Sequence, residues 1–383
     1  LDVYFPKEAK RKLKPILNIG YLSSDFQDHV VGYLVQELFA LHNRKEFRII
    51  VYSSGVDDMS ANRQNIIKNC DEFIDINRLS SVEVAQRIYD DQVDILVDLN
   101  GYTVGSRLEI SAMRPAPIQI NYLGFPGTVG KFFDYIILDQ TVLEPKEEVH
   151  FCEKVIYIPP YYVVNNRPPE FHSKPRRKDL ELPEDGFVFC SFNKPNKIEP
   201  VMFECWMNIL KKTPGSVLWL FNDNSIATTN LKRSASKFGV SPERLMFAEK
   251  IPRKQHFSRL QVADLVLDTR LYNGGATSWD ALSVGVPVIT LRGQNVPSRA
   301  SASMLTSLGL KELITYDLEA YEALALKLAI DQEELENIKN KIIKNTKTSA
   351  LFNAEQSVNS IEKAYKSIWK DFARGIEPHS TYI

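Results

Sequence analysis

The chain has 383 residues, of which 44% are hydrophobic and 25% charged, a composition typical of a soluble globular protein large enough for two domains. Its 47 basic and 48 acidic residues leave a formal charge of -1, so no global field attracts nucleic acid or an anionic membrane. We find no apolar run of transmembrane length and no signal-peptide pattern, which together predict a cytoplasmic protein. The four cysteines lie far apart without metal-ligand spacing, so we expect reduced core thiols.

The chain begins at Leu1, without methionine, in a basic segment that leads directly into a strand-like run. This start suggests a fragment of a longer protein. The sequence contains no repeat with a period of 20 to 50 residues, so any repeat array would lie outside it.

The first half of the chain alternates between apolar runs typical of buried strands and stretches with helical spacing. We predict helices at 30–39, 61–70 and 82–90, and strands at 16–22, 47–52, 71–76, 95–99, 120–123, 134–138 and 155–158. Repeated βαβ units predict a parallel sheet with right-handed crossovers.

Polar residues and glycines follow several of these strands. His29 lies between the first strand and the following helix, Thr103 ends the segment Asn-Gly-Tyr-Thr, and Gly124 and Pro126 belong to a backbone-exposing turn. Ligands of open α/β sheets bind at this edge. His29 is therefore either a general base, a hydrogen-bond donor or a structural histidine.

Between residues 165 and 183 the composition changes to prolines and basic residues. We interpret this stretch as a connection between domains. The predicted organisation is an N-terminal Rossmann-like acceptor-side domain at 1–165, a linker at 166–185, a C-terminal Rossmann-like nucleotide-sugar domain at 186–350 and, at 351–383, a C-terminal helix that packs back.

A second βα series follows the connection. We predict strands at 187–192, 217–221, 245–247 and 263–268, and helices at 198–212, 231–238, 253–262, 276–284 and 297–308, before three further helices that end near residue 372. The two series predict two nucleotide-type folds that face each other across a cleft.

A glycine pair, Gly274 and Gly275, separates a buried strand from a helix in this second series. Glycines there allow a tight turn and bring backbone N–H groups close to a ligand at the positive end of the helix. The turn from Tyr272 through Ala276 to Thr277 is therefore either a diphosphate cradle or a simple βα turn.

Four cationic or aromatic side chains could complete such a site. Lys197 follows a strand and precedes a helix, so its ammonium group either reaches a ligand at that helix or lies in solvent. Arg253, His256 and Arg259 recur every three residues on a predicted helix, where they line either a pocket or a solvated face.

The motifs that are missing narrow the class of enzyme. The sequence has no Walker A motif and no Gly-x-Gly-x-x-Gly after its first strand, which argues against NTPases and dinucleotide oxidoreductases. It also has no Asp-any-Asp triplet and no His/Cys cluster with ligand spacing, so we expect no divalent metal at the diphosphate. Metal-free sugar-nucleotide transferases and related epimerases remain.

Five segments together resemble the catalytic region of the O-GlcNAc transferase and SPINDLY family. They are GYLSSDFQDH (20–29), DLNGYTVGSRLEISAMRPAPIQINYLGFPGTVG (98–130), SFNKPNKIEP (191–200), PRKQHFSRLQVADLVLDT (252–269) and NGGATSWDALSVGVPVIT (273–290). The resemblance implies a GT-B fold and an inverting, metal-independent transfer of a sugar, with UDP-GlcNAc as the expected donor, to Ser or Thr hydroxyls of a protein. It also implies tetratricopeptide repeats upstream.

The resemblance assigns roles to individual residues. His29 matches the family's active-site histidine, and Lys197 matches the essential lysine at the diphosphate. His256 matches the ring stacked on the base, while Arg253 and Arg259 match neighbouring nucleoside contacts. The remaining matches are Asp280 at the ribose, Gly124 and Pro126 near the sugar, and Thr103 on the acceptor side.

The sequence departs from the family at three places. Gly275, Ala276 and Thr277 replace a usual His-Thr-Thr, and Asp94 replaces a histidine close to the acceptor side. At Tyr272 the O-GlcNAc transferases have cysteine, whereas SPINDLY-like members have tyrosine. These changes leave GDP-fucose or a UDP-hexose as alternative donors, and a catalytically silent nucleotide-sugar-binding module as an alternative function.

Overall fold

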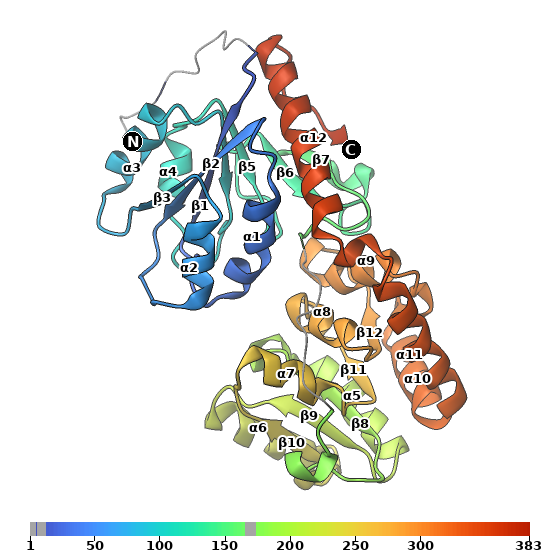
Figure 1. Cartoon of the computed structure of the whole chain (residues 1–383). Coiled ribbons are helices and arrows are strands. Elements are labelled where there is room, and N and C mark those ends of the chain that lie inside the picture. Colours follow the sequence, from blue (N-terminus) through green and yellow to red (C-terminus); the bar gives the residue numbers. More distant parts are fainter. Residues whose placement is uncertain (1–4, 6–12, 165–173) are drawn as a thin grey trace. The chain divides into compact units, whose positions relative to one another are not determined.

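The computed structural model describes residues 5, 13–164 and 174–383, which divide into two compact units (Figure 1). Unit 1 comprises Leu1–Asn166 and Asn353–Ile383, and unit 2 comprises Arg167–Phe352. Residues 165–173 of the predicted connection, and most of the basic N-terminal segment, lie outside the described residues.

Unit 1 is built on an eight-stranded sheet with the order β14-β7-β6-β5-β4-β1-β2-β3. Its neighbouring strands pair in parallel, as the βαβ alternation predicts. The strands are β1 (Leu17–Ser23), β2 (Phe47–Ser53), β3 (Glu72–Asp75), β4 (Ile95–Asp98), β5 (Ile118–Asn121), β6 (Tyr135–Leu138), β7 (Lys154–Tyr157) and β14 (Thr381–Tyr382).

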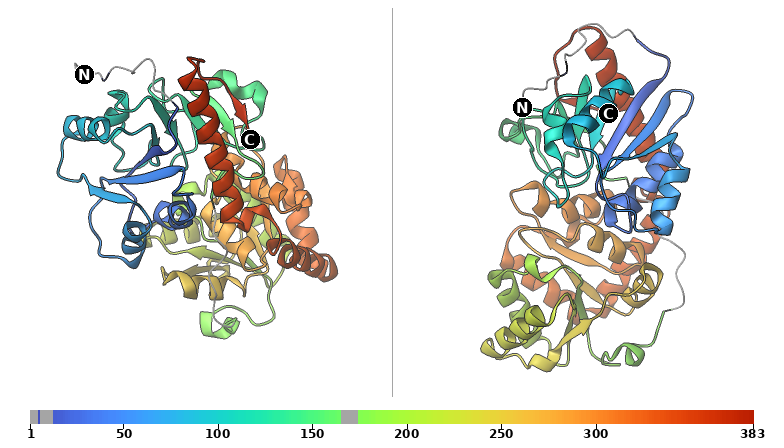
Figure 2. Two further views of the ribbon diagram at one scale, coloured as in Figure 1. Left: turned by 45° about the horizontal axis from the view of Figure 1, so that its top comes forward. Right: turned by 90° about the vertical axis from the view of Figure 1, so that its left-hand side faces the viewer.

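Helices pack beside this sheet in two groups. Helix α1 packs against both α2 and α12, and α3 packs against α4; Figure 2 shows unit 1 in two further views. The bounds are α1 (Val30–Leu41), α2 (Ala61–Lys68), α3 (Ser81–Asp90), α4 (Leu108–Ala112) and α12 (Ala354–Ala373). Because helices cover the sheet, β1 and β4 are almost completely buried. Most of their residues are therefore apolar, as is usual for strands in a parallel sheet.

Helix α12 joins the core of unit 1 although it lies more than 300 residues from β1 in sequence. Its Tyr365 hydroxyl lies 3.1 Å from the Tyr21 hydroxyl on β1. Glu362 Oε1 lies 3.0 Å from His42 Nδ1 and accepts the Asn43 amide at 2.7 Å. Strand β14 then pairs with β7, with Thr381 opposite Ile156, so both ends of the chain build one sheet.

Unit 2 is built on a six-stranded parallel sheet with the order β10-β9-β8-β11-β12-β13. Its strands are β8 (Val188–Ser191), β9 (Val217–Phe221), β10 (Leu245–Ala248), β11 (Leu265–Leu267), β12 (Val288–Leu291) and β13 (Ile314–Thr315). Its helices are α5 (Pro200–Lys212), α6 (Ser225–Lys237), α7 (Arg253–Leu260), α8 (Ala276–Ser283), α9 (Ala300–Ser307), α10 (Leu318–Ile330) and α11 (Gln332–Thr346).

The structure adds to the predicted elements and corrects some of them. Helix α6 begins six residues before its predicted start, because Asn224 caps it by accepting the Ala227 amide at 2.8 Å. The predicted helix from 198 begins at Pro200, after a 3₁₀ turn over Pro195–Lys197. Strand β12 and helix α4 were not predicted; both are short, which leaves little periodicity to detect.

The expectation of core thiols is correct for two cysteines and wrong for another. Cys190 and Cys205 are buried, Cys70 is partly buried and Cys152 is exposed. Cys152 lies just after a 3₁₀ turn that ends at His150, in a surface connection that precedes β7. Its sequence neighbours therefore do not place it in a core.

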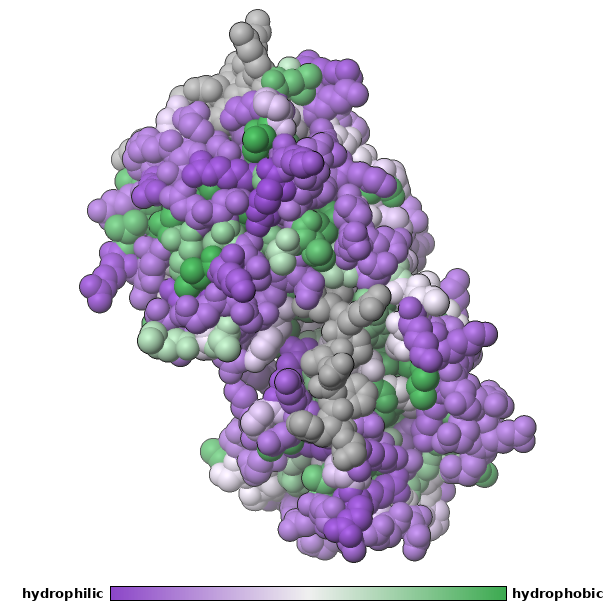
Figure 3. Space-filling view, in the orientation of Figure 1, coloured by the Kyte–Doolittle hydropathy of each residue, from purple (hydrophilic) through white to green (hydrophobic). Residues whose placement is uncertain are grey.

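The outer face seen in Figure 3 is mostly hydrophilic, and its apolar residues are scattered. Throughout the described part of the chain, no helix combines the length and the apolar character needed to cross a membrane.

Candidate functional site

The turn between β11 and α8 in unit 2 is fixed by a buried carboxylate. Asp268, fully buried at the end of β11, accepts the Gly274 amide at 2.7 Å and the Thr269 amide at 2.9 Å through Oδ1. A Cβ added to Gly274 would lie 2.2 Å from Ser278 Oγ, and Gly275 has φ +56°. Only glycine meets both requirements without strain, so the glycine pair is dictated by the shape of the turn.

The first turn of α8 offers backbone donors at this place. Among the described residues, the amides of Gly275 and Ala276 have no hydrogen-bond partner. The Thr277 hydroxyl donates to Asn193 Oδ1 at 3.0 Å and so ties the turn to the segment after β8. Free N–H groups at the positive end of a helix are suited to an anion such as a phosphate.

Lys197, in the 3₁₀ turn Pro195–Lys197 between β8 and α5, lies against this turn. Its Nζ donates to the carbonyl oxygen of Asn273 at 2.9 Å and lies 3.9 Å from the centre of the Tyr272 ring. Burial lowers the pKa of Lys197 to about 8, while the charge of Asp268 opposes this decrease. The ammonium group is therefore partly desolvated next to the free amides of α8.

The three residues that recur along α7 converge with Asp280 of α8. Arg253 Nη2 lies 3.0 Å from Asp280 Oδ1, and His256 Nε2 lies 4.0 Å from Asp280 Oδ2. Arg259 Nε donates to His256 Nδ1 at 3.0 Å. The four side chains thus form one continuous cluster rather than a solvated helix face.

The protonation states in this cluster follow from burial. Burial, together with Arg259 and Arg253, lowers the pKa of His256 to about 3, so its ring is neutral at physiological pH. Burial also raises the pKa of Asp280 to about 6, against the opposing charge of Arg253. A neutral ring, two cations and a carboxyl group suit a heterocyclic base and a ribose hydroxyl.

Sequence reasoning missed the aromatic residues of this cluster. Phe192, after β8, has its ring 5.2 Å from the His256 ring and 4.8 Å from the Arg259 guanidinium carbon. Trp219 of β9 lies 4.8 Å from Phe192. Both were assigned only to apolar strands. Only Phe192 carried a signal in the sequence. It is the last residue of the predicted strand 187–192, at the end of the sheet where ligands bind.

In unit 1, two predicted site residues lie at the carboxyl ends of neighbouring strands. His29 follows β1, and Thr103 follows β4. His29 caps α1, where its Nδ1 accepts the Val31 amide at 3.3 Å and lies 3.6 Å from Asp25 Oδ2. Asn100 donates to Asp25 Oδ2 at 3.1 Å and to Thr103 Oγ1 at 2.8 Å. Burial raises the pKa of Asp25, and His29 opposes that increase.

The turn with Gly124 and Pro126 belongs to the same edge. A Cβ on Gly124 would lie 2.3 Å from the Leu99 carbonyl oxygen, so the two strand ends approach closely. Phe125 donates its amide to the carbonyl of Asn100 at 3.1 Å. Asn100 therefore links the three loops that follow β1, β4 and β5; the sequence placed it in a loop but assigned it no role.

The prediction that Asp94 lies near the acceptor-side residues is wrong. Asp94 precedes β4, whereas Thr103 follows it, so the two residues lie at opposite edges of the sheet. Asp94 is fully buried, pairs with Lys14 at 2.9 Å and accepts the Asn18 amide at 2.9 Å. Its role is to anchor the start of β1 to the start of β4.

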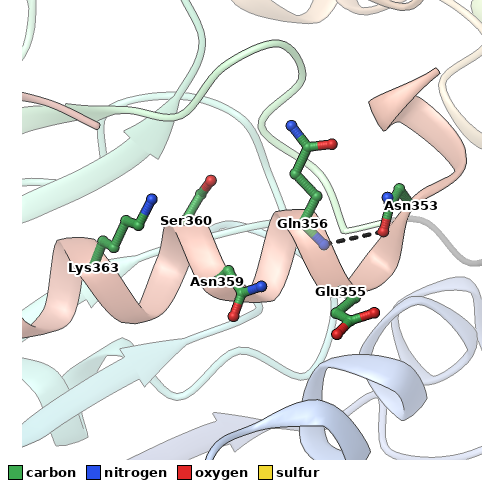
Figure 4. A pocket seen from close by; sticks show the side chains of 6 residues that line it. All are labelled: Asn353, Glu355, Gln356, Asn359, Ser360 and Lys363. Carbon is green, nitrogen blue, oxygen red and sulfur yellow. Dashed lines mark hydrogen bonds between the residues drawn. The ribbon is translucent and has the colours of Figure 1, made fainter. Parts of the chain in front are cut away.

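Outside these clusters, the described residues offer little that could hold a ligand. The described residues contain no group of three or more His, Cys, Asp or Glu side chains arranged to hold a metal ion. A polar hollow of about 310 Å³ lies along the first turns of α12 (Figure 4), lined by Asn353, Glu355, Gln356, Asn359, Ser360 and Lys363. It contains none of the predicted site residues.

Two parallel α/β units, one of them with a phosphate-type turn beside a nucleoside-type cluster, define the GT-B class of glycosyltransferase fold. The family comparison agrees with this class. The model of glycosyl transferase family 41 matches residues 2–174 and 166–361, and the chain belongs to this family.

Individual relatives also have names of glycosyltransferases. The chain is 36% identical to the probable UDP-N-acetylglucosamine–peptide N-acetylglucosaminyltransferase SEC of Arabidopsis thaliana, over 94% of this chain and 38% of SEC. It is 29% identical to the corresponding SPINDLY protein of Petunia hybrida, over 97% of this chain and 40% of that protein. The chain thus spans well under half the length of these relatives.

A solved structure of an O-GlcNAc transferase mutant from Thermobaculum terrenum is similar in fold. It superposes with a TM-score of 0.89 and 29% identity, over 97% of this chain and 70% of the other.

Proposed function

We propose that this chain transfers N-acetylglucosamine from UDP-GlcNAc to Ser or Thr hydroxyls of a protein, with inversion at the anomeric carbon and without a metal ion. The observation that carries the proposal is the position of Lys197, whose ammonium group lies at the Asn273 carbonyl beside the free amides of α8. The names of the relatives support the donor and the peptide acceptor.

In this proposal the chemistry is mainly stabilisation of the leaving group. As the bond from the sugar to the diphosphate breaks, negative charge develops on the diphosphate oxygens. Lys197 and the amides of Gly275 and Ala276 neutralise that charge, which is the role a metal ion has in other transferases. His256, Arg259, Arg253 and Asp280 hold the nucleoside so that the diphosphate meets the turn.

We assign the acceptor side to unit 1. His29, Thr103 and the turn with Gly124 and Pro126 share one sheet edge, and the hydrogen bonds of Asn100 connect their loops. His29 orients the reacting groups in this proposal. We also propose a cytoplasmic location, since all four cysteines are free thiols.

The test is release of UDP or GDP by the wild type and by Lys197→Ala, with UDP-GlcNAc, UDP-glucose, UDP-galactose and GDP-fucose as donors, with and without EDTA. We expect turnover of UDP-GlcNAc that is insensitive to EDTA and reduced by about 100-fold or more in the variant. Lys211→Ala, at an exposed position in the last turn of α5, is the matched control and should retain most activity.

Other outcomes of this assay contradict particular parts of the proposal. Loss of turnover with EDTA would exclude the metal-free diphosphate site. Nucleotide binding without turnover of any donor, in the presence of acceptor proteins, would identify a silent binding module.

A second donor is favoured by one observation. Tyr272 places its ring against Lys197, so a bulky side chain occupies space next to the proposed phosphate site. A smaller sugar without an N-acetyl group, such as fucose from GDP-fucose or a UDP-hexose, would avoid that ring. Turnover of GDP-fucose or a UDP-hexose in preference to UDP-GlcNAc would establish this alternative.

A further inference from the structure

Asp268 is buried at the base of the donor turn, and although it lies in the segment 252–269 that resembles the family, neither the sequence analysis nor the proposed mechanism assigns it a role. Its side chain is fully buried between β11 and the following turn. A buried carboxylate is costly unless hydrogen bonds or a cation compensate for the lost hydration. Its partners therefore indicate why this position holds an acid.

The partners of Asp268 come from both sides of the turn. Oδ1 accepts the amides of Thr269 and Gly274, at 2.9 and 2.7 Å, and Oδ2 accepts the Thr290 hydroxyl at 2.7 Å. Because Gly274 donates inward to Asp268, the next two amides remain available at the start of α8.

The same turn connects Asp268 to Lys197. Asn273 precedes the held glycine, and its carbonyl oxygen accepts the Lys197 ammonium. The Asn273 side chain is itself fixed, since its Nδ2 donates to the Thr269 carbonyl at 2.7 Å. A shift of Gly274 would therefore move the oxygen that positions Lys197.

We propose that Asp268 is a positioning residue of the donor site, which holds the Gly274 amide and thereby the preceding Asn273 carbonyl oxygen that accepts the Lys197 ammonium. The effect of Asp268 on catalysis rests on the proposed function. Its hydrogen bonds to the turn do not, because they are present in the protein without a donor.

The electrostatic part of the role has a defined direction. Two charged groups act on Lys197: Asp268, which raises its pKa, and Lys194, which lowers it. Burial raises the pKa of Asp268, while its hydrogen bonds from Thr290 and Gly274 and the charge of Lys197 oppose that increase and favour the ionised form. Removing the charge of Asp268 leaves burial and Lys194 unopposed, so Lys197 loses its proton at lower pH. Tyr272, which faces Lys197 with its ring, supplies no opposing charge.

The test compares Asp268→Asn with Thr290→Val. Asparagine has the shape of aspartate and can still accept the two amides, but it carries no charge. Valine at 290 removes one hydroxyl donor from the same carboxylate and preserves its charge. Lysine side-chain NMR, assigned with Lys197→Ala, gives the titration midpoint of Lys197, and selective glycine labelling gives the hydrogen exchange of the Gly274 amide.

For Asp268→Asn we expect the Lys197 midpoint to fall by roughly one pH unit and the Gly274 amide to exchange faster, because a neutral acceptor holds it more weakly. Thr290→Val should leave the midpoint near the wild-type value. Equal midpoints in the two variants, or unchanged exchange at Gly274 in Asp268→Asn, would overturn the proposal.

A kinetic measurement separates this inference from the proposed function. The pH dependence of kcat/KM for the donor reports groups of the free enzyme. A fall of one unit from a pKa of about 8 leaves about fivefold less protonated Lys197 near pH 8, so kcat/KM should be about fivefold lower there and should recover towards pH 6. If the wild type turns over no donor while the NMR midpoint still shifts, the proposed function fails and the positioning role stands.

Discussion

At the residue scale, the donor side is governed by burial of charged groups next to one another. Lys197, Asp268, Asp280 and His256 all have shifted pKa values, and in each case burial is the largest cause. Such shifts are common where a site must bind or stabilise charge, although structural ion pairs also produce them. Here the geometry and the shifts agree, since Lys197 and Asp268 lie at the turn before α8, and His256 lies 4.0 Å from Asp280 within α8.

We expect the affinity for a nucleoside to decrease at acid pH, and we assign this decrease, the acid limb of the binding curve, to Asp280. Below about pH 6 its carboxyl group takes up a proton and loses the charge that pairs with Arg253, whereas His256 stays neutral down to about pH 3. We therefore expect the affinity for uridine to decrease as the pH falls through 6, by up to about tenfold per unit. Calorimetry with uridine rather than UDP avoids the titration of the phosphate near pH 6.

The matched variants for this titration are Asp280→Asn and His256→Gln. Asp280→Asn should bind more weakly at neutral pH and show no acid limb, while His256→Gln should bind more weakly and keep it. An acid limb that persists in Asp280→Asn would assign the titration to another group.

At the element scale, α12 is attached to unit 1 by a buried polar network. With its single proton on Nδ1, a neutral His42 donates to the Glu362 carboxylate, at 3.0 Å, and its Nε2 accepts from the Tyr21 hydroxyl, at 2.8 Å. The same carboxylate accepts the Asn43 amide, so one side chain serves two donors at the end of α1. If one member of such a network is removed, its former partners stay buried without a hydrogen bond, and this lowers the stability of the fold.

Glu362→Ala should therefore destabilise unit 1 by about 2 to 4 kcal/mol, since it leaves the buried His42 ring and the part-buried Asn43 amide without their acceptor. The urea transition of unit 1 measures this change. Glu355→Ala, at an exposed position on the same helix, should change the free energy of unfolding by less than about 0.5 kcal/mol. Equal effects of the two substitutions would show that the network adds no stability.

At the scale of the whole molecule, the two units differ in how the chain builds them. Unit 2 is one continuous segment, whereas unit 1 needs both Leu1–Asn166 and Asn353–Ile383. The described donor-side residues, from Phe192 to Asp280, all belong to unit 2. Deletion of 353–383 removes five large buried side chains from unit 1: Val358, Ile361, Tyr365, Ile368 and Trp369.

We expect a fragment of residues 167–352 to fold and to bind the nucleotide within roughly tenfold of the affinity of the whole chain. Residues 1–166 without α12 should not unfold cooperatively, because apolar surface of the sheet loses its cover. Circular dichroism with thermal scans tests both fragments. A cooperative 1–166 fragment, or a 167–352 fragment that binds no nucleotide even though the whole chain does, would contradict this division.

The sequence by itself determined the class of fold. Apolar runs such as 95–99, alternating with helical spacing, indicate parallel strands covered on both faces, since these runs are apolar at nearly every position and too short for helices. The glycine pair at 274 and 275 and the residues that match the family then indicated a nucleotide-sugar site. Neighbouring residues are sufficient to predict the class of fold and the site, because the conformation of a turn and the apolar pattern of a strand both depend on residues close in sequence.

Only the tertiary structure decided how distant residues meet. It placed Asp94 and Thr103 at opposite ends of the strands, although they are only nine positions apart in sequence, because β4 runs between them from one end of the sheet to the other. It also brought Lys197 to the Asn273 carbonyl, Phe192 to His256 and Glu362 to His42. These contacts depend on strand order and on how helices pack, and no pattern of neighbouring residues specifies either.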